Sequence, residues 1–348
     1  TGFTGHLVGE EFGRRGLGFV LAGRDAAALG EQAEELRTEY GVETVTRVAT
    51  TDDDASLDAM LDGVDVLINC AGPFTDCGPP VARAAIRNRV HYLDTTGEQA
   101  FMRWLAEECH DEAVEAGTVV IAGCAFEYAV GDLAAELALR QGASRIVVCY
   151  APRNLAMSPG TKKSVVRSIS DPGFTYVDGH LEKKRPGYRL FDVPFPDGST
   201  RKGAWFPGGE PLQVARRGGV SWVESCLAIG DGKAYFIATF SGVIPTMMKM
   251  LKPVADRVAE QSEGDPHESP QGEPDFLVIA FDPKTGRHWA TLGGRDVYLT
   301  TAKIIVEAAT RLTKKVPAKK GFTSPSAIFD ADSFIEAVGL EIVRVGDE

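Results

Sequence analysis

Short apolar runs alternate with amphipathic stretches over the first third of the chain. The run Phe19–Ala22 stops at Gly23, as expected for a strand that is buried on both faces of a parallel sheet. Apolar residues then recur at helical spacing through 26–40. The same pattern predicts further strands at 44–48, 64–69, 91–94 and 118–122 and helices at 6–15, 54–61, 80–89 and 99–116. This alternation predicts an α/β fold with a doubly wound parallel sheet.

Beyond Ala129 the pattern changes to longer, more aromatic strands and hairpin turns. Turn residues at 197–198 and 282–286 each separate two strand-like runs, which indicates hairpins. Other predicted elements are helices at 131–140, 162–168, 243–258 and 299–312, strands at 145–150 and 234–240, a polar loop at 262–275 and a helical tail at 321–338. We therefore expect a first domain at 1–125, a mixed α/β second domain at 126–298, and C-terminal helices at 299–348 that return to the first domain.

The chain opens within a glycine-rich motif. Gly2 and Gly5 fit the later glycines of a loop that turns tightly and lets backbone N–H groups approach a pyrophosphate. Gly2, Phe3, Thr4 and Gly5 are therefore candidate cofactor-binding residues. The first glycine and the strand before it are absent, so we interpret the sequence as a fragment of a Rossmann domain without its first strand. Alone, this half-motif would fit an ordinary capped helix equally well.

Arg24 lies 24 − 5 = 19 positions after Gly5, where the second strand of a dinucleotide fold ends beside the adenosine ribose. An acidic residue there would accept a hydrogen bond from a 2′-hydroxyl, whereas an arginine would bind a 2′-phosphate. Arg24 therefore favours NADP over NAD. Asp25 could repel that phosphate or cap the next helix.

Composition excludes some classes of function. The net charge of −12 disfavours nonspecific nucleic-acid binding. The six cysteines lack a C-x-x-C spacing and indicate buried thiols in a reducing compartment, so we expect a cytoplasmic protein. No apolar stretch is long enough for an integral membrane span. The Met-rich helix predicted at 243–258 could touch lipid peripherally or pack in the core.

Two loops follow predicted parallel strands, at the edge of the sheet where ligands bind. Residues 69–74 read Asn-Cys-Ala-Gly-Pro-Phe, so that the small residues Cys70, Ala71, Gly72 and Pro73 could approach a ribose or nicotinamide. Residues 94–98 place acidic and hydroxyl groups at the same edge. Either loop could equally serve only as a turn or a helix cap.

These segments resemble, in order, the saccharopine dehydrogenase-like oxidoreductases, and most of all their branch of trans-acting enoyl reductases. The resemblance rests on 1–5, 21–24, 69–74, 91–98 and 123–128 and continues through 158–161 and 298–302. It implies a Rossmann domain, a mixed α/β second domain and reduction with NADPH. The chain departs from the family at 126–130, where Phe-Glu-Tyr-Ala-Val replaces a segment of the Phe-Asp-Ser-Val-Pro type.

The proton donor of such a reductase is less clearly marked. Tyr128 is our first candidate because it follows a predicted strand at the cofactor edge, with Lys162 or Lys163 as a cationic neighbour that would make its phenol a better acid. Glu127 and solvent are alternatives. No histidine pair has metal-ligand spacing, so we expect no metal.

Three functions are consistent with these features. The leading one is an NADPH-dependent reductase of an enoyl or related hydrophobic acyl substrate. The second is a dehydrogenase of an amino-acid-derived imine, which would need grouped arginines to bind carboxylates. The third is a non-catalytic NADP-binding sensor or scaffold. The partners that we expect are a small-molecule substrate and a second copy of the chain in a homodimer, and neither nucleic acid nor an integral membrane anchor.

Overall fold

A computed structural model of the protein describes residues 2–153, 171–241, 274–315 and 317–346. The chain divides into two compact units. Unit 1 comprises Thr1–Thr96, Trp104–Ala125 and Tyr298–Thr323, and unit 2 comprises Gly97–Arg103, Phe126–Val297 and Ser324–Glu348. The helices predicted at 162–168 and 243–258, and nearly all of the loop predicted at 262–275, lie outside the described residues.

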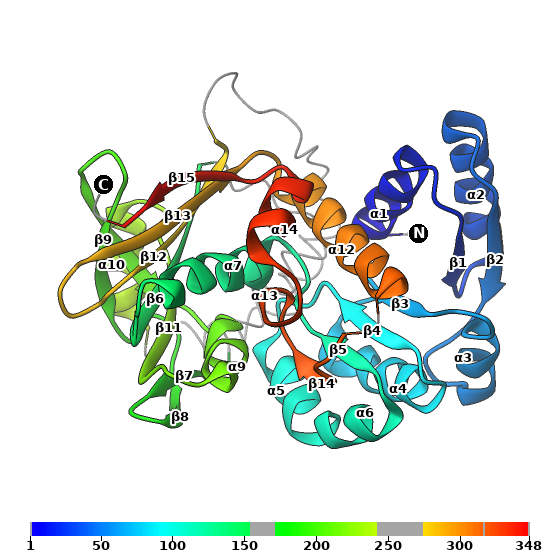
Figure 1. Ribbon diagram of the computed structural model, residues 1–348, viewed down its shortest axis with the longest axis horizontal. Coiled ribbons are helices and arrows are strands. Elements are labelled where there is room, and N and C mark those ends of the chain that lie inside the picture. The colour runs from blue at the N-terminus through cyan, green and yellow to red at the C-terminus, as the bar shows by residue number, and fades with distance from the viewer. Residues whose placement is uncertain (1, 154–170, 242–273, 316, 347–348) are drawn as a thin grey trace. The chain divides into compact units, whose positions relative to one another are not determined.

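Unit 1 alternates helices with parallel strands, which confirms the predicted fold class (Figure 1). Strands β1 (Phe19–Gly23) and β2 (Thr44–Val48) form one sheet, and a second, four-stranded sheet has the order β14-β5-β4-β3. The strands of this second sheet are β3 (Val66–Asn69), β4 (His91–Asp94), β5 (Val119–Ile121) and β14 (Gly321–Thr323). The helices are α1 (Phe3–Arg14), α2 (Ala26–Tyr40), α3 (Asp54–Met60), α4 (Phe74–Arg87), α6 (His110–Ala116) and α12 (Val297–Lys314), which starts one residue before unit 1.

Local sequence signals set the boundaries of these helices. The carboxylate of Asp25 accepts hydrogen bonds from the N–H groups of Ala27 and Ala28 and so caps α2, which Gly41 ends in a left-handed conformation. Asp53 caps α3 in the same way. The helix that we predicted at 99–116 is interrupted at Cys109, which separates α5 (Gln99–Glu108) from α6. Helix α5 begins in unit 2 and ends in unit 1.

Unit 2 is built on a nine-stranded mixed sheet (Figure 1). Its main path has the order β15-β13-β12-β6-β11-β10-β9, and β7 pairs with β11 and β8. The pair β6–β11 is parallel and the other pairs are antiparallel. The strands are β6 (Arg145–Pro152), β7 (Gly173–Val177), β8 (His180–Lys184), β9 (Leu190–Pro194), β10 (Thr200–Trp205), β11 (Trp222–Leu227), β12 (Phe276–Phe281), β13 (His288–Gly294) and β15 (Glu341–Val345).

Strand β6 forms the centre of this unit because both of its faces are buried. Val147, Cys149 and Ala151 belong to an apolar cluster with aromatic residues of β9, β10 and β12. On the alternate positions, Val148 and Tyr150 approach Gly131 of helix α7 (Phe126–Arg140). Helix α7 packs on β6, β12 and β13. The remaining helices of the unit are α9 (Glu210–Gln213), the 3-10 turn η1 (Ala215–Arg217), α10 (Asp231–Phe240), α13 (Pro325–Ile328) and α14 (Ala331–Val338).

The prediction of a strand at 234–240 was wrong, because these residues belong to helix α10. A short apolar run fits a strand or a helix equally well, and the turn before it decides between them. Gly230 has φ 98° and leads directly into the helix. Ala234 is then buried, whereas Tyr235 and Phe236 are 50% and 59% exposed.

The unit to which the C-terminal residues belong also differs in part from the prediction. Residues 298–323 join unit 1, as expected, because β14 pairs with β5. Residues 324–348 were expected there too, but they belong to unit 2 because α13 and α14 contact α7 and β15 pairs with β13. Strands β14 and β15 were not predicted from the sequence, and β14 occupies the start of the tail at 321–338 that was expected to be helical.

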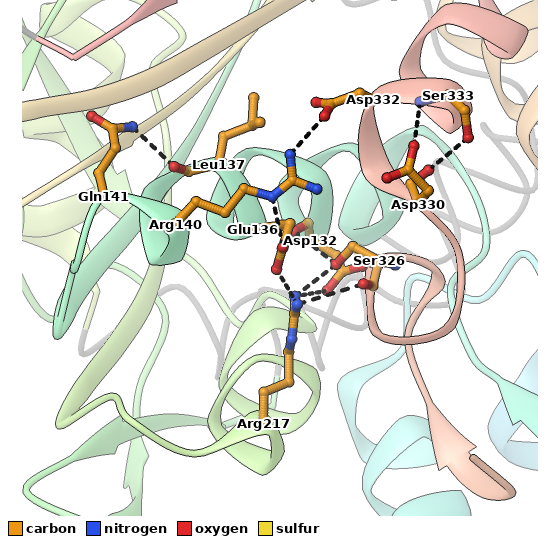
Figure 2. Close-up of polar contacts among 10 residues, drawn as sticks. All are labelled: Asp132, Glu136, Leu137, Arg140, Gln141, Arg217, Ser326, Asp330, Asp332 and Ser333. Atoms are coloured by element: carbon orange, nitrogen blue, oxygen red, sulfur yellow. Dashed lines mark hydrogen bonds and ion pairs between the residues drawn. The ribbon is translucent and has the colours of Figure 1, made fainter. Parts of the chain in front are cut away.

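A polar cluster fastens η1 and α13 to α7 (Figure 2). Arg217 donates to Asp132 at 3.5 Å, to Glu136, and to the hydroxyl of Ser326 at 2.7 Å. Asp132 is fully buried and also accepts from the N–H of Ser326 at 2.7 Å. Arg140, further along α7, donates to Glu136 at 2.9 Å and pairs with the exposed Asp332 at 2.9 Å.

We predict that Arg217→Ala lowers the free energy of unfolding by about 3 kcal/mol, because it leaves a buried carboxylate without its cation. The matched variant Arg140→Ala removes the ion pairs of an exposed arginine with Glu136 and Asp332, leaves the contact of Arg217 with the buried Asp132 in place, and should lower this free energy by less than about 1 kcal/mol. Urea denaturation followed by tryptophan fluorescence measures both values. Equal small losses would contradict the role that we assign to Arg217.

Candidate functional site

The N-terminus of α1 has the features of an anion-binding helix end. Its cap residue is Gly2, so no side chain caps the helix, and its first turn holds no acidic residue. A Cβ atom at Gly2 would have no neighbour within 4 Å, so the backbone there is accessible. A Cβ atom at Gly5 would lie 3.8 Å from the Cβ of Cys70. The structure therefore brings together two of the segments predicted to bind the cofactor.

Phe3 lies on the same first turn. Its ring packs edge-on against Tyr298 of α12, with the ring centroids 5.0 Å apart. Thr4 is the next residue of α1. The segment 298–302 that carried part of the family resemblance thus contacts the predicted glycine-rich loop within unit 1.

Arg24 directly follows β1 and is exposed. Its neighbour Asp25 holds the N–H groups of Ala27 and Ala28 at 3.0 and 3.1 Å, which settles that Asp25 serves as a helix cap. Within the described ranges, Arg24 makes no hydrogen bond or ion pair. Its guanidinium group is therefore available for an anionic ligand.

The loop after β3 is held by the side chain of Asn69. This amide donates to the hydroxyl of Tyr92 at 3.1 Å and accepts from the N–H of Ala71 at 3.0 Å. Gly72 and Pro73 follow, and Pro73 is the cap residue of α4. Burial raises the pKa of the Cys70 thiol to about 12, so this side chain is a neutral, small lining group rather than a nucleophile.

The loop after β4 has a structural anchor in Asp94. This fully buried side chain accepts from the N–H groups of Thr96 at 2.9 Å and Gly123 at 2.8 Å, and so ties the end of β4 to the end of β5. Asp94 thus shapes the carboxyl edge of the sheet.

The donor set of unit 1 fits a phosphorylated dinucleotide. It offers an uncapped helix end for a pyrophosphate, a guanidinium group at the end of β1 for a 2′-phosphate, and small residues at 70–73 where a nucleoside can approach. Gly2, Phe3, Thr4, Gly5, Arg24, Cys70, Ala71, Gly72 and Pro73 would hold it.

In unit 2, the chain kinks at the start of α7. Glu127 has ψ 144° and Tyr128 has φ 68°, so neither residue is helical. A left-handed conformation is uncommon for a residue with a side chain, and it requires surrounding contacts to maintain it. The N–H of Tyr128 donates to the hydroxyl of Tyr150 at 2.7 Å.

Tyr150 belongs to a fully buried cluster around Glu210. The Tyr150 hydroxyl donates to Oε1 of Glu210, and the Ser225 hydroxyl donates to Oε2 at 2.6 Å. Burial raises the pKa of Glu210 to about 7, and the two hydroxyl groups oppose this shift. This cluster was not predicted from the sequence. Its signals were the tyrosine within an apolar strand and the acid after Gly208-Gly209, since buried polar groups need partners.

The predicted proton donors have different environments. The Tyr128 hydroxyl donates to the carbonyl oxygen of Gly97 at 3.0 Å, and burial raises its pKa well above the usual value, which makes it a weaker acid. Glu127 is half-buried and has no hydrogen-bond or ion-pair partner in the described part of the chain. Burial alone raises its pKa. Lys162 lies outside the described residues, so its role stays a prediction.

Part of the chain is similar to a known protein family. Residues 1–121 match the model of the saccharopine dehydrogenase NADP binding domain. The chain is 28% identical over 225 residues to the saccharopine dehydrogenase-like oxidoreductase of Rattus norvegicus, covering 59% of this chain and 51% of that protein. The chain thus spans about half the length of this relative.

A trans-acting enoyl reductase of Mycobacterium ulcerans is 29% identical over 135 residues, covering 38% of this chain and 32% of that protein. The fold resembles that of saccharopine dehydrogenase (L-Glu forming) from Saccharomyces cerevisiae, with a TM-score of 0.59, 13% identity, and coverage of 98% and 97% of the two chains. Residues 1–121 are thus similar to the NADP-binding domain of saccharopine dehydrogenases, and the chain is similar to the saccharopine dehydrogenase-like oxidoreductases.

Proposed function

We propose that the protein is an NADPH-dependent reductase that transfers a hydride to an enoyl or related hydrophobic acyl substrate. The observation that carries this proposal is the guanidinium group of Arg24 at the end of β1, which has no partner among the described residues, in a segment that matches an NADP-binding domain. The similarity to a trans-acting enoyl reductase supports the substrate class.

Enoyl reduction needs one donor of a hydride and one donor of a proton. Bound NADPH would supply the hydride. Reduction of an enoyl thioester adds that hydride to one carbon of the double bond and a proton to the other, so the protein or solvent must deliver one proton. We assign this step to Glu127, because its carboxyl has no competing partner in the described residues and a raised pKa keeps it protonated at higher pH. Tyr128 remains a predicted alternative.

One feature disfavours the imine dehydrogenase. Binding an amino-acid substrate would need arginines that are available to its carboxylates. Arg217 of unit 2 is already engaged by Asp132, Glu136 and Ser326 and is therefore not available for this role.

The compartment is part of the proposal. All six cysteines are free thiols, consistent with the reducing cytoplasm that we propose. No helix among the described residues is long and apolar enough to cross a membrane. The homodimer stays a prediction.

Arg24→Ala should weaken NADPH binding by about 30-fold and leave NADH binding unchanged, because a charge-assisted contact with the 2′-phosphate is lost. Calorimetric titration of the full-length protein with each nucleotide measures this preference. The matched control is Arg37→Ala, which removes an exposed arginine of α2 that pairs with Glu34. Equal losses for both nucleotides would refute a 2′-phosphate contact.

Glu127→Gln should lower kcat by about 100-fold with trans-2-enoyl thioesters, because a general acid is lost. A general acid acts only when protonated, so kcat of the wild type should fall as pH rises through the raised pKa of Glu127. The variant should lack this fall. NADPH oxidation across a pH series gives both results, with the exposed Glu341→Gln as control. Nucleotide binding without any substrate-dependent oxidation would instead favour the non-catalytic scaffold.

A further inference from the structure

The peptide group between Glu127 and Tyr128 is held by a directional chain of hydrogen bonds. The Tyr128 N–H donates to the Tyr150 hydroxyl, and this hydroxyl has only one proton to give. That proton goes to Oε1 of Glu210. The second oxygen of Glu210 accepts from Ser225, so these hydrogen bonds end at a carboxyl group whose two oxygens each accept a hydroxyl. The donors come from α7, β6 and β11, so three separate elements fix one peptide group.

The groups around these hydrogen bonds leave them little room to rearrange. A Cβ atom at Gly131 would overlap both Glu210 and the Tyr150 hydroxyl, and one at Gly208 would overlap Ser225 and Glu210. A Cβ atom at Gly209 would lie 2.7 Å from Cγ of Tyr128. Glycine at these positions lets the backbone approach the polar groups closely. The cluster is thus closely packed and almost fully buried.

Stability of the fold alone does not explain the buried carboxyl group of Glu210. Burying an acid lowers stability unless its interactions compensate for desolvation, and a neutral acceptor could satisfy the same hydroxyl groups. Asp132 on α7 adds a like charge that further disfavours the anion. An anionic acceptor nevertheless polarises the Tyr150 hydroxyl and so strengthens its hold on the Tyr128 N–H.

We propose that Tyr150 and Glu210 are positioning residues, which fix the kink at Glu127–Tyr128 and so aim the Glu127 carboxyl for proton transfer. This inference rests on the proposed role of Glu127. Neither residue needs to touch substrate. Their effect passes through the backbone, because the peptide group that they hold determines ψ of Glu127 and φ of Tyr128.

Tyr150→Phe tests this proposal, because it deletes the hydroxyl and keeps the ring that packs against Phe126 and Phe206. We expect kcat with trans-2-enoyl thioesters to fall about tenfold, with KM and NADPH affinity changed less than about twofold. The amide proton of Tyr128 should exchange faster with solvent. The matched control is Tyr235→Phe on the exposed face of α10, which should change none of these values.

The same substitution in the Glu127→Gln variant distinguishes a positioning role of Tyr150 from a general loss of structure. In Glu127→Gln, adding Tyr150→Phe should cause no further loss of kcat, because the residue that it positions is already absent. An equal tenfold loss in both backgrounds would overturn the proposal, as would an unchanged kcat for Tyr150→Phe while Glu127→Gln remains impaired. If Glu127→Gln itself keeps full activity, the proposed role of Glu127 fails, and the positioning role fails with it.

Should Tyr150→Phe fold poorly, Ser225→Ala provides a milder change. It removes one of the two hydroxyl donors to Glu210 and leaves Tyr150 in place. We expect a loss of kcat of about threefold, again absent in the Glu127→Gln background. A loss that is equal in both backgrounds would contradict the positioning role by an independent route.

Discussion

Carboxylates that are shielded from water must receive hydrogen bonds, and this requirement organises unit 2. Asp132, Glu210 and Glu224 are each fully buried. Glu224 accepts from Tyr188, Arg189 and Trp222, Glu210 from Tyr150 and Ser225, and Asp132 from Arg217 and Ser326. In each case the donors come from different parts of the sequence. The acids therefore act as points where elements of the unit are joined in fixed positions.

Much of unit 1 could be predicted because its signals are local. The helix at 26–40 carries its own cap at Asp25 and its own stop at Gly41, and apolar runs mark its strands. The candidate cofactor residues followed from the same local patterns, since glycines and Arg24 occupy fixed positions relative to a strand and a helix.

Unit 2 depends on contacts that no local pattern reveals. Tyr150 meets Glu210 across 60 positions, and β15 pairs with β13 although hairpin signals predict only neighbouring strands. The run 234–240 was predicted as a strand because its periodicity cannot distinguish a strand from a helix. Likewise, the sequence marked Tyr128 and Glu127 as candidate acids. Only their surroundings show that the Tyr128 hydroxyl is engaged, whereas the Glu127 carboxyl has no partner among the residues that the structure describes.

The path of the chain has a consequence for how the protein is made. Each unit is assembled from three separate segments, and β14 and β15 follow in sequence the strands with which they pair. The ribosome must therefore synthesise residues up to Thr323 before β5 gains this partner, and up to Val345 before β13 gains its own. Until then β5 and β13 each lack a neighbouring strand, and unpaired strands invite aggregation during synthesis. The synthesis of β14 and β15 thus determines when these two exposed strand edges become paired.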